Sequence, residues 1–457
     1  MTRPAPETRV LIVGAGPAGI RAAELLCAAG LCPVVVDEGG LAGGQIYRRP
    51  PEGFRRKGRA LYGSEAGKAR ALHDTFDALT AEGALQHVPG ASVVAISEGI
   101  AHILCQGRVG KISYDRLILA TGAMDRIAPV PGWQAPGVYT LGAAQIALKA
   151  QGVALGRRIV LAGSGPLLTL LAHQLRKAGA GLVTVLDTAP MAGQLRALPA
   201  MMARPGVVLR GLAMRAGLGR RYHAGVTLVQ ITSDATGVTA LHWRDARGRM
   251  HVSACDMVGL GWHLRAETHL ADLAGVPFDW SETWAQWLPR ADAMGRAGAG
   301  RYLAGDGLRI LGADGAEIVG RLAATACLRD LGLPAPDPAA DLRVLARMTR
   351  FAKGLARAFP WPGATVRALP DTAVICRCEG ITRADLRAGM ALGGAEANRI
   401  KSVARLGMGR CQGRYCQLAG AEILAADSGC LPAEAGRLRA QPPVRPVPVS
   451  AHLSGDG

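Results

Sequence analysis

Lysine and aromatic residues are scarce in this 457-residue chain. Lysine supplies only seven of the 53 basic residues, and Phe, Trp and Tyr together make up 4% of the chain. The arginines that produce the formal net charge of +18 are dispersed, with no long basic run and no nucleic-acid-binding motif. We therefore expect no nucleic-acid partner. A compositional bias towards arginine explains the charge, and an electropositive face for an acidic protein or an anionic membrane surface is the alternative.

Long apolar runs are also missing. A membrane-spanning helix needs about 20 consecutive apolar residues, and the most apolar stretch, residues 159–175, is interrupted by Gly-Ser-Gly-Pro. The N-terminal residues lack the apolar core of a signal peptide. The sequence thus predicts a protein without a transmembrane segment, either cytoplasmic or peripheral to the inner membrane, in a reducing setting where thiols stay free. Its length predicts two to four domains.

Cysteine is sparse except in one segment near the C-terminus. Cys376 and Cys378 are followed after 32 residues by Cys411 and Cys416, in glycine-rich, basic surroundings. Four thiolates suit Zn²⁺ or an iron–sulfur cluster, and nearby N–H groups and positive charge suit an anionic cluster. We predict a [2Fe–2S] site at these four residues. Zinc, and free or disulfide-bonded cysteines, remain as alternatives.

The N-terminal region carries a dinucleotide-binding pattern. An apolar strand at residues 9–13 leads into Gly14-Ala-Gly16-Pro-Ala-Gly19 and a helix, and a second strand ends at Asp37 and Glu38. In this βαβ unit the glycines permit a tight turn, approach of the backbone to a pyrophosphate, and close packing of helix on strand. The helix N-terminus faces the phosphates, and Asp37 is placed for a ribose hydroxyl.

A second unit repeats the pattern less faithfully. Strand 158–162 is followed by Gly163-Ser-Gly165-Pro-Leu-Leu168, a helix, and a strand that precedes Asp187. Leu168 replaces the third glycine and should push the helix away from the strand. A working second nucleotide site and a degenerate Rossmann domain kept as scaffold are both open at this point.

Two further turns complete the nucleotide-binding set. A buried strand at 117–120 ends in Thr121-Gly122, and Gly305-Asp306 follows another strand and precedes a helix beginning near residue 316. A carboxylate at Asp306 can accept a hydrogen bond from a sugar-alcohol hydroxyl while the helix N-terminus meets phosphate.

We predict an α/β fold of two Rossmann-like dinucleotide-binding domains, the second inserted in the first, plus a small helical C-terminal [2Fe–2S] domain. The expected boundaries are 1–127 with 253–333 for the first domain, 128–252 for the insert, 334–370 for a connector with a short helix at 348–359, 371–437 for the cysteine domain, and 438–457 for an extended proline-rich tail.

These motifs, together with Gly43-Gly44-Gln45-Ile-Tyr-Arg48, resemble the flavoprotein superfamily with two dinucleotide-binding domains. Nearly the whole chain resembles the A (alpha) subunit of heteromeric flavin-dependent amino-acid dehydrogenases: opine oxidase, hydrogen cyanide synthase, D-hydroxyproline dehydrogenase and dye-linked proline dehydrogenase. The similar segments include residues 131–138, 142–145, 161–168, 376–379 and 407–416. The cysteine region resembles the bacterioferritin-associated-ferredoxin type of [2Fe–2S] domain, with CxxxxC in place of the closing CxxC.

The resemblance implies FAD at the first site, although some relatives hold another adenine nucleotide there. It implies the following cofactor-binding residues: Gly14, Gly16, Pro17, Ala18, Gly19, Asp37, Glu38, Gly44, Gln45, Arg48, Val93, Thr121, Gly122, Gly305 and Asp306. It also implies a partner flavoprotein subunit of the amine or amino-acid oxidase type that oxidises the substrate. An FMN between the subunits, a quinone acceptor and a small third subunit of the ferredoxin-like type belong to the same expectation.

The resemblance thus implies an electron-transfer subunit of an FAD-dependent oxidoreductase acting on CH–NH or CH–NH₂ donors. An NAD(P)H-dependent FAD/iron–sulfur reductase is the alternative, which Leu168 weakens. Disulfide reduction is rejected, because no cysteine pair follows Gly44 and no cysteine lies between Cys105 and Cys255. No catalytic base is identified among the histidines, which fits a subunit whose cofactors carry the reaction.

Overall fold

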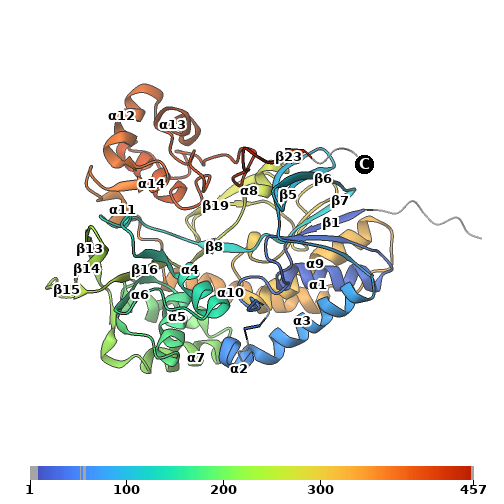
Figure 1. Ribbon diagram of the computed structural model, residues 1–457, viewed down its shortest axis with the longest axis horizontal. Coiled ribbons are helices and arrows are strands. Elements are labelled where there is room, and N and C mark those ends of the chain that lie inside the picture. The colour runs from blue at the N-terminus through green and yellow to red at the C-terminus, as the bar shows by residue number, and fades with distance from the viewer. Residues whose placement is uncertain (1–8, 52, 55–57, 454–457) are drawn as a thin grey trace, which may run out of the picture.

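A computed structural model describes residues 9–51, 53–54 and 58–453. Residues 1–8, 52, 55–57 and 454–457 lie outside it. The start of the predicted first domain and the end of the predicted tail therefore lie outside the described residues. Figure 1 shows two α/β domains side by side, with a helical C-terminal module above the strands that connect them.

The first domain is built on a parallel sheet of order β20-β7-β1-β2-β3. All four residues of β1 are buried, as expected for a strand covered on both faces. Helices α1 and α9 pack closely, because a Cβ on Gly320 would lie 2.2 Å from the carbonyl oxygen of Ala18. The strands are β1 Val10–Val13, β2 Val34–Asp37, β3 Gln86–Pro89, β4 Ala91–Ser97, β5 Ile100–Cys105, β6 Arg108–Ser113, β7 Arg116–Leu119, β18 Phe278–Ser281, β19 Gln286–Pro289 and β20 Arg301–Leu303. The helices are α1 Pro17–Ala28, α2 Gly58–Tyr62, η1 Gly63–Glu65, α3 Ala66–Ala81, α8 His269–Leu273, η4 Gly305–Gly307 and α9 Gly312–Asp330.

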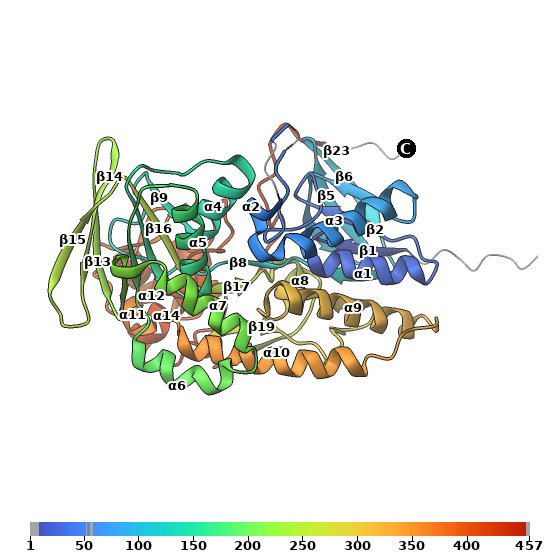
Figure 2. The same cartoon turned by 90° about the horizontal axis from the view of Figure 1, so that it is seen from below.

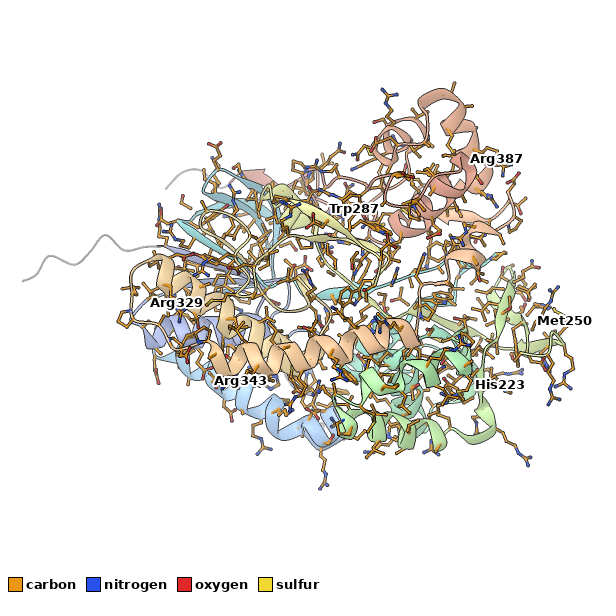
Figure 3. The ribbon with its side chains drawn as sticks, turned by 180° about the vertical axis from the view of Figure 1, so that it is seen from behind. His223, Met250, Trp287, Arg329, Arg343 and Arg387 are labelled. Carbon is orange, nitrogen blue, oxygen red and sulfur yellow. The ribbon has the colours of Figure 1, made fainter. Side chains whose placement is uncertain are left out.

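The second domain repeats the plan with a parallel sheet of order β12-β11-β10-β16-β9. Its antiparallel β13–β15 sheet projects from the body, and Met250 lies at its outer end (Figure 3). The strands are β9 Val138–Thr140, β10 Ile159–Ser164, β11 Leu182–Asp187, β12 Tyr222–Ala224, β13 Thr227–Asp234, β14 Gly237–Arg244, β15 Met250–Ala254 and β16 Met257–Trp262. The helices are α4 Leu141–Ile146, the π-helix η2 Ala147–Gln151, α5 Pro166–Lys177, α6 Met191–Met201, α7 Pro205–Ala216 and η3 Gly219–Arg221.

The insertion of one α/β domain into the other is confirmed, but it ends later than predicted. Strand β16 pairs with β10 from Met257 to Trp262 in the second sheet, so a return to the first domain at residue 253 is wrong. The chain crosses between domains on β8 Ala123–Asp125 and β17 Leu264–Ala266, which pair with each other. The apolar residues of β16 would suit either of the two buried parallel sheets, so the sequence alone does not show which sheet the strand joins.

The predicted connector contains a longer helix than expected. Helix α10 spans Ala339–Ala358 and runs from α9 to α6 across both domains (Figure 2). It buries Met348, Phe351 and Ala352, and a Cβ on Gly354 would lie 2.9 Å from the backbone nitrogen of Met201. The expected helix at 348–359 therefore covers only the second half of α10.

The C-terminal module is mainly helical, and its tail returns to the first domain. Its elements are α11 Gly363–Arg367, β21 Val374–Cys376, β22 Ile381–Thr382, α12 Arg383–Gly393, α13 Ala397–Ala404, α14 Gln417–Ser428 and β23 His452–Leu453. The tail is extended, as its prolines predict, but it is also packed: Val444 is buried and donates its N–H to the carbonyl oxygen of Val94, and β23 pairs with β6.

Candidate flavin and cysteine sites

The first glycine motif has the geometry of a phosphate-binding turn. Gly14 has φ +110°, and a Cβ there would lie 2.3 Å from the carbonyl oxygen of Ala120. A Cβ on Gly19 would lie 1.8 Å from the carbonyl oxygen of Gly14, so only glycine lets α1 pack this closely. Gly16 begins α1 without a side-chain cap, which leaves the helix N-terminus suited to an anion.

The loop after β2 lies directly against this turn. Gly44 has φ +62°, and a Cβ there would lie 2.9 Å from the Cα of Gly16. The structure therefore brings the predicted Gly44-Gln45 segment next to the motif. Arg48 donates to the Gln45 side-chain oxygen at 3.3 Å. Lys149 of η2 crosses from the second domain to donate to the carbonyl oxygen of Ile46 at 3.2 Å, and burial lowers its pKa to about 8.

The two predicted ribose acids have protein partners. The Asp37 carboxylate accepts the N–H groups of Ala15 and Gly39, each at 2.6 Å. Burial raises the pKa of Asp37 in spite of these hydrogen bonds. Glu38 pairs with Arg445 of the tail at 2.6 Å, so the tail lies across this end of the site, and Val444 of the tail shares an apolar cluster with Val93 of β4. Contact of either acid with a ribose stays a prediction.

Asp306 holds the start of α9. One carboxylate oxygen accepts the N–H groups of Leu311 and Gly312 at 2.8 and 3.1 Å, while burial raises the pKa of Asp306 to about 6. A Cβ on Gly307 would lie 2.8 Å from the hydroxyl of Thr121, so the two predicted turns meet here. A Cβ on Gly122 would meet nothing within 4 Å, which leaves open space beside them.

The second glycine motif is closed by its own domain. Leu168 is fully buried in a hydrophobic cluster with residues of β10 and α4. A Cβ on Gly165 would lie 3.2 Å from the Cα of His263, so the chain after β16 covers this turn. Asp187 is 1% exposed; its carboxylate accepts the Ala189 N–H at 2.9 Å and the Tyr222 hydroxyl. Burial raises the pKa of Asp187 despite the Tyr222 hydrogen bond. An acid covered in this way is poorly placed to bind a ribose.

The four predicted cysteine ligands lie together at one end of the module, and all ten cysteines of the chain are free thiols. Cys411 and Cys416 each interact with the other thiols of the set, and side-chain hydrogen bonds join Cys376 with Cys416 and Cys378 with Cys411. Hydrogen bonds from Cys416 and from the backbone N–H groups of Gly407, Glu379 and Cys378 lower the pKa of Cys376 to about 6. The same pair contact and burial raise the pKa of Cys416.

A zinc ion or a [2Fe–2S] cluster at these four cysteines stays a prediction. Within the described part of the chain, no three His, Cys, Asp or Glu side chains stand close enough to hold one ion. Zinc would need all four thiolates to converge on one point, whereas a [2Fe–2S] cluster takes two thiolates on each iron. Positive charge lies nearby, because the buried Arg265 and Lys401 interact with Cys416.

A buried polar network joins the cysteine loop to the first domain. Thr121 donates to the carbonyl oxygen of Glu267 at 2.8 Å, and the Glu267 carboxylate pairs with Arg414 at 2.7 Å. His269 lies 2.7 Å from the same carboxylate through Nδ1 and 2.8 Å from the carbonyl oxygen of Gln412 through Nε2. Burial raises the pKa of Glu267, but His269 and Arg414 outweigh it and hold that pKa well below its usual range.

Sequence reasoning missed this junction. Glu267, His269 and Arg414 are each less than 9% exposed, and the acid lies 147 residues from its arginine. The signal available was a Glu-x-His spacing in an otherwise apolar segment after β16. Trp133 was also missed as a docking residue: it donates its indole N–H to the carbonyl oxygen of Val374 at 2.6 Å and holds the module against the second domain.

Comparisons with known proteins agree with this architecture. Residues 8–283 match the pyridine nucleotide-disulphide oxidoreductase family, and residues 372–456 match the sarcosine oxidase A3 domain. The chain is 38% identical over 463 residues to the A subunit of opine oxidase from Rhizobium meliloti, covering 96% of this chain and 86% of that protein. It is 31% identical over 469 residues to hydrogen cyanide synthase subunit HcnB of Pseudomonas protegens, covering 98% and 97%.

Among solved structures, L-proline dehydrogenase from P. horikoshii matches with a TM-score of 0.71 at 19% identity, covering 98% of this chain and 81% of that chain. This match supports the fold across all three parts of the molecule. None of the helices in the described ranges is both long and apolar enough to cross a membrane. The chain therefore belongs to the pyridine nucleotide-disulphide oxidoreductase family, as a flavoprotein oxidoreductase subunit related to the opine oxidase A subunits.

Proposed function

We propose that this chain is the electron-transfer flavin and iron–sulfur subunit of a heteromeric dehydrogenase or oxidase for an amino acid, an opine or another secondary amine. The observation that carries the proposal is the buried Thr121–Glu267–Arg414 junction, which ties the predicted flavin turn to the cysteine loop. The related proteins named as oxidase and synthase subunits support the heteromeric assembly.

FAD, or another adenine nucleotide, would bind at the first glycine motif. The free N-terminus of α1 at Gly16 would meet the pyrophosphate, and the open space beside Gly122 and the carboxylate of Asp306 would accommodate the sugar-alcohol chain. Bound flavin would supply two-electron acceptance and one-electron release, which a [2Fe–2S] cluster can take up singly.

Cys376, Cys378, Cys411 and Cys416 would hold that cluster. The pairwise contacts of the thiols support it, as do the backbone N–H groups around Cys376. Buried Arg265 and Arg414 lie behind the loop and would offset the negative charge of the cluster. The role of the protein is thus to fix the loop and its charge, and not to move protons.

The remaining parts of the assembly are further proposals. Oxidation of the C–N bond would take place on a partner flavoprotein subunit, with FMN at the interface between subunits. A small ferredoxin-like protein would be an additional component of the complex. A quinone would take the electrons from the cluster. The complex would lie in the cytoplasm or on the inner membrane.

An NAD(P)H-dependent reductase is the second candidate, and the second domain argues against it. Asp187 is held by Tyr222, and Gly165 is covered by His263. Mixing the purified chain with NADH or NADPH separates the two functions. We expect no rapid bleaching of the flavin absorbance, and rapid bleaching would favour the reductase.

The main test measures flavin, iron and acid-labile sulfide in the purified chain. We expect about two iron and two sulfide per chain and an electron spin resonance signal after reduction. Cys416→Ser should lose both, whereas Cys430→Ser, a thiol in the same module outside the set, should keep them. Zinc in place of iron would refute the proposal. Full amine dehydrogenase activity of the isolated chain would also contradict it, because that activity should require the partner.

A further inference from the structure

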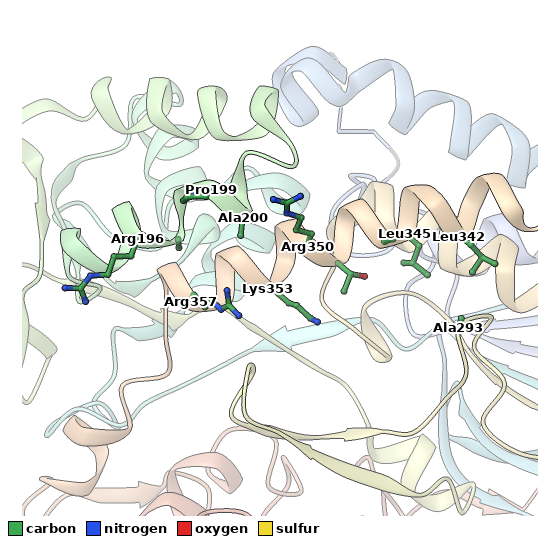
Figure 4. A pocket seen from close by; sticks show the side chains of 12 residues that line it. Arg196, Pro199, Ala200, Ala293, Leu342, Leu345, Arg350, Lys353 and Arg357 are labelled. Carbon is green, nitrogen blue, oxygen red and sulfur yellow. The ribbon is translucent and has the colours of Figure 1, made fainter.

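A groove of about 750 Å³ lies between α6 and α10, the two neighbouring helices at the bottom of Figure 2. Its floor is apolar, with Ala197 and Ala200 from α6 and Leu342 and Leu345 from α10. Its basic side chains come from the same two helices: Arg196, Arg350, Lys353 and Arg357 (Figure 4). Below we call it the α6–α10 groove.

The four cations of the groove have no protein partner. Within the described residues none of their side chains makes a hydrogen bond or an ion pair, and no carboxylate lines the groove. Nearby arginines behave differently, because Arg204 pairs with Asp314 and Arg210 pairs with Glu65 at 2.7 Å. Unpaired cations also occur outside the groove, because Arg343 and Arg347 on the same helix make no ion pair within the described residues. What sets the groove apart is that four such cations gather around one apolar floor.

Helix α6 also presents an apolar stripe to solvent. Met191, Leu195, Leu198 and Met202 are spaced as one helical face and are 47%, 64%, 37% and 48% exposed. The helix itself buries only Ala197 fully. By helical periodicity this stripe lies on the side of α6 away from Ala197 and Ala200, which line the groove, so it is a separate exposed apolar face.

We propose that the α6–α10 groove docks the partner flavoprotein subunit, through a ridge of that subunit that carries carboxylates beside apolar side chains. This inference rests on the proposed function, which supplies the partner. Apolar side chains flanked by arginine are typical of the core of a protein interface, and unpaired cations select an acidic partner.

Other occupants fit the groove less well. From Leu342 to Arg357 it follows α10 for about 22 Å, which exceeds a small anion and suits a protein segment. A bilayer surface would not fill a concave groove. A second copy of this chain is disfavoured by the net charge of +18. Docking here leaves α12 and α13, at the top of Figure 1, free to meet an electron acceptor.

The test uses the native complex. A tagged chain is purified from its own host, the subunit that co-purifies in stoichiometric amount is identified, and its affinity for variants of the full chain is measured. Arg350→Glu with Lys353→Glu should weaken binding at least tenfold, and the difference should narrow at high salt. Arg343→Glu with Arg347→Glu is the matched control, because it makes the same change of charge on the same helix outside the groove (Figure 3).

A second pair tests the apolar floor of the groove. Ala346→Asp, at an exposed position that lines the groove, should weaken binding at least tenfold, whereas Leu392→Asp, at an 83% exposed site on α12, should have no effect. The inference would be overturned if the groove variants bound the partner as tightly as the control variants. It would also be overturned if groove and control variants lost the same amount of affinity. Loss of binding to phosphatidylglycerol vesicles with partner binding intact would assign the groove to a membrane instead. A co-purifying subunit without flavin would refute the proposed function, but a flavoprotein partner that ignores the groove would refute only this inference.

Discussion

Replacing Glu267 by Gln should loosen the cysteine loop from the flavin domain. The Glu267 carboxylate lies between Arg414 at 2.7 Å and His269 at 2.7 Å, and all three side chains are buried. A glutamine keeps the shape of the side chain but removes its charge. Its amide N–H₂ group is a donor, so it would face the donor groups of Arg414 and His269 that now meet the carboxylate.

The cost can be bounded from the contacts that remain. Removing one partner of a buried ion pair typically costs 3–5 kcal/mol. Arg414 would keep its hydrogen bonds to the carbonyl oxygens of Cys411 at 3.2 Å and Val444 at 2.7 Å, so we expect the lower end, about 3 kcal/mol. If this energy is lost in local opening of the loop, its amides should exchange roughly a hundredfold faster.

Hydrogen–deuterium exchange of residues 405–445 measures this directly at pH 7. The pKa of Glu267 lies well below its usual range, so its contribution is fully present above about pH 4 and is lost only as pH falls further. The difference between variant and wild type should therefore stay constant from pH 6 to pH 8. Asp371→Asn, which breaks an exposed pair with Arg387 in the same module, should leave exchange unchanged. Equal exchange in Glu267→Gln and wild type would show that the junction does not hold the loop.

Two other substitutions test the first nucleotide site. Gly320→Ala should separate α1 from α9, destabilise the fold by about 1–3 kcal/mol and weaken flavin retention. The control is Gly211→Ala on α7, where a Cβ would meet nothing within 4 Å, and it should stabilise the fold by up to about 1 kcal/mol. Thermal unfolding and flavin content are measured for both variants, and equal melting temperatures would contradict the close packing of α1 on α9. Asp306→Asn should weaken flavin binding but raise the melting temperature of the flavin-free chain. Since the pKa of Asp306 is raised to about 6, the stability of the wild type falls as the pH rises from about 4 to 6. The gain in melting temperature of the Asn variant should therefore be absent at pH 4 and constant above pH 7. A higher melting temperature of the variant at pH 4 would contradict this prediction.

The nucleotide-binding turns could be predicted from sequence because glycine is required there by backbone geometry. Gly14 and Gly19 leave no room for a side chain, so their spacing carries the fold with it. The buried strands of the parallel sheets were readable for a similar reason, since both of their faces must be apolar. The assignment of β16 was not readable, because which sheet it joins depends on long-range pairing and not on its composition.

The candidate site was predictable only where ligands cluster in sequence. The paired cysteines were found from local spacing, but the Glu267–Arg414 junction joins distant segments and shows no periodic pattern. The tail was expected to be extended because prolines prevent regular structure, and its packing against the first domain was not foreseen. A few specific contacts hold it instead, among them the pair between Arg445 and Glu38.

The two Rossmann units also show why an acid after the second strand is weak support for a nucleotide site. Asp37 and Asp187 both accept backbone N–H groups of their own unit, so the acid stabilises the turn whether or not a ribose binds. What separates the units is access. Asp187 is 1% exposed and held by Tyr222, and Gly165 is covered by His263, whereas Gly16 faces only another glycine. A Tyr222→Phe substitution would remove one hydrogen bond to Asp187 but leave Gln194, Leu168 and His263 in place, so it should not create an NADH site.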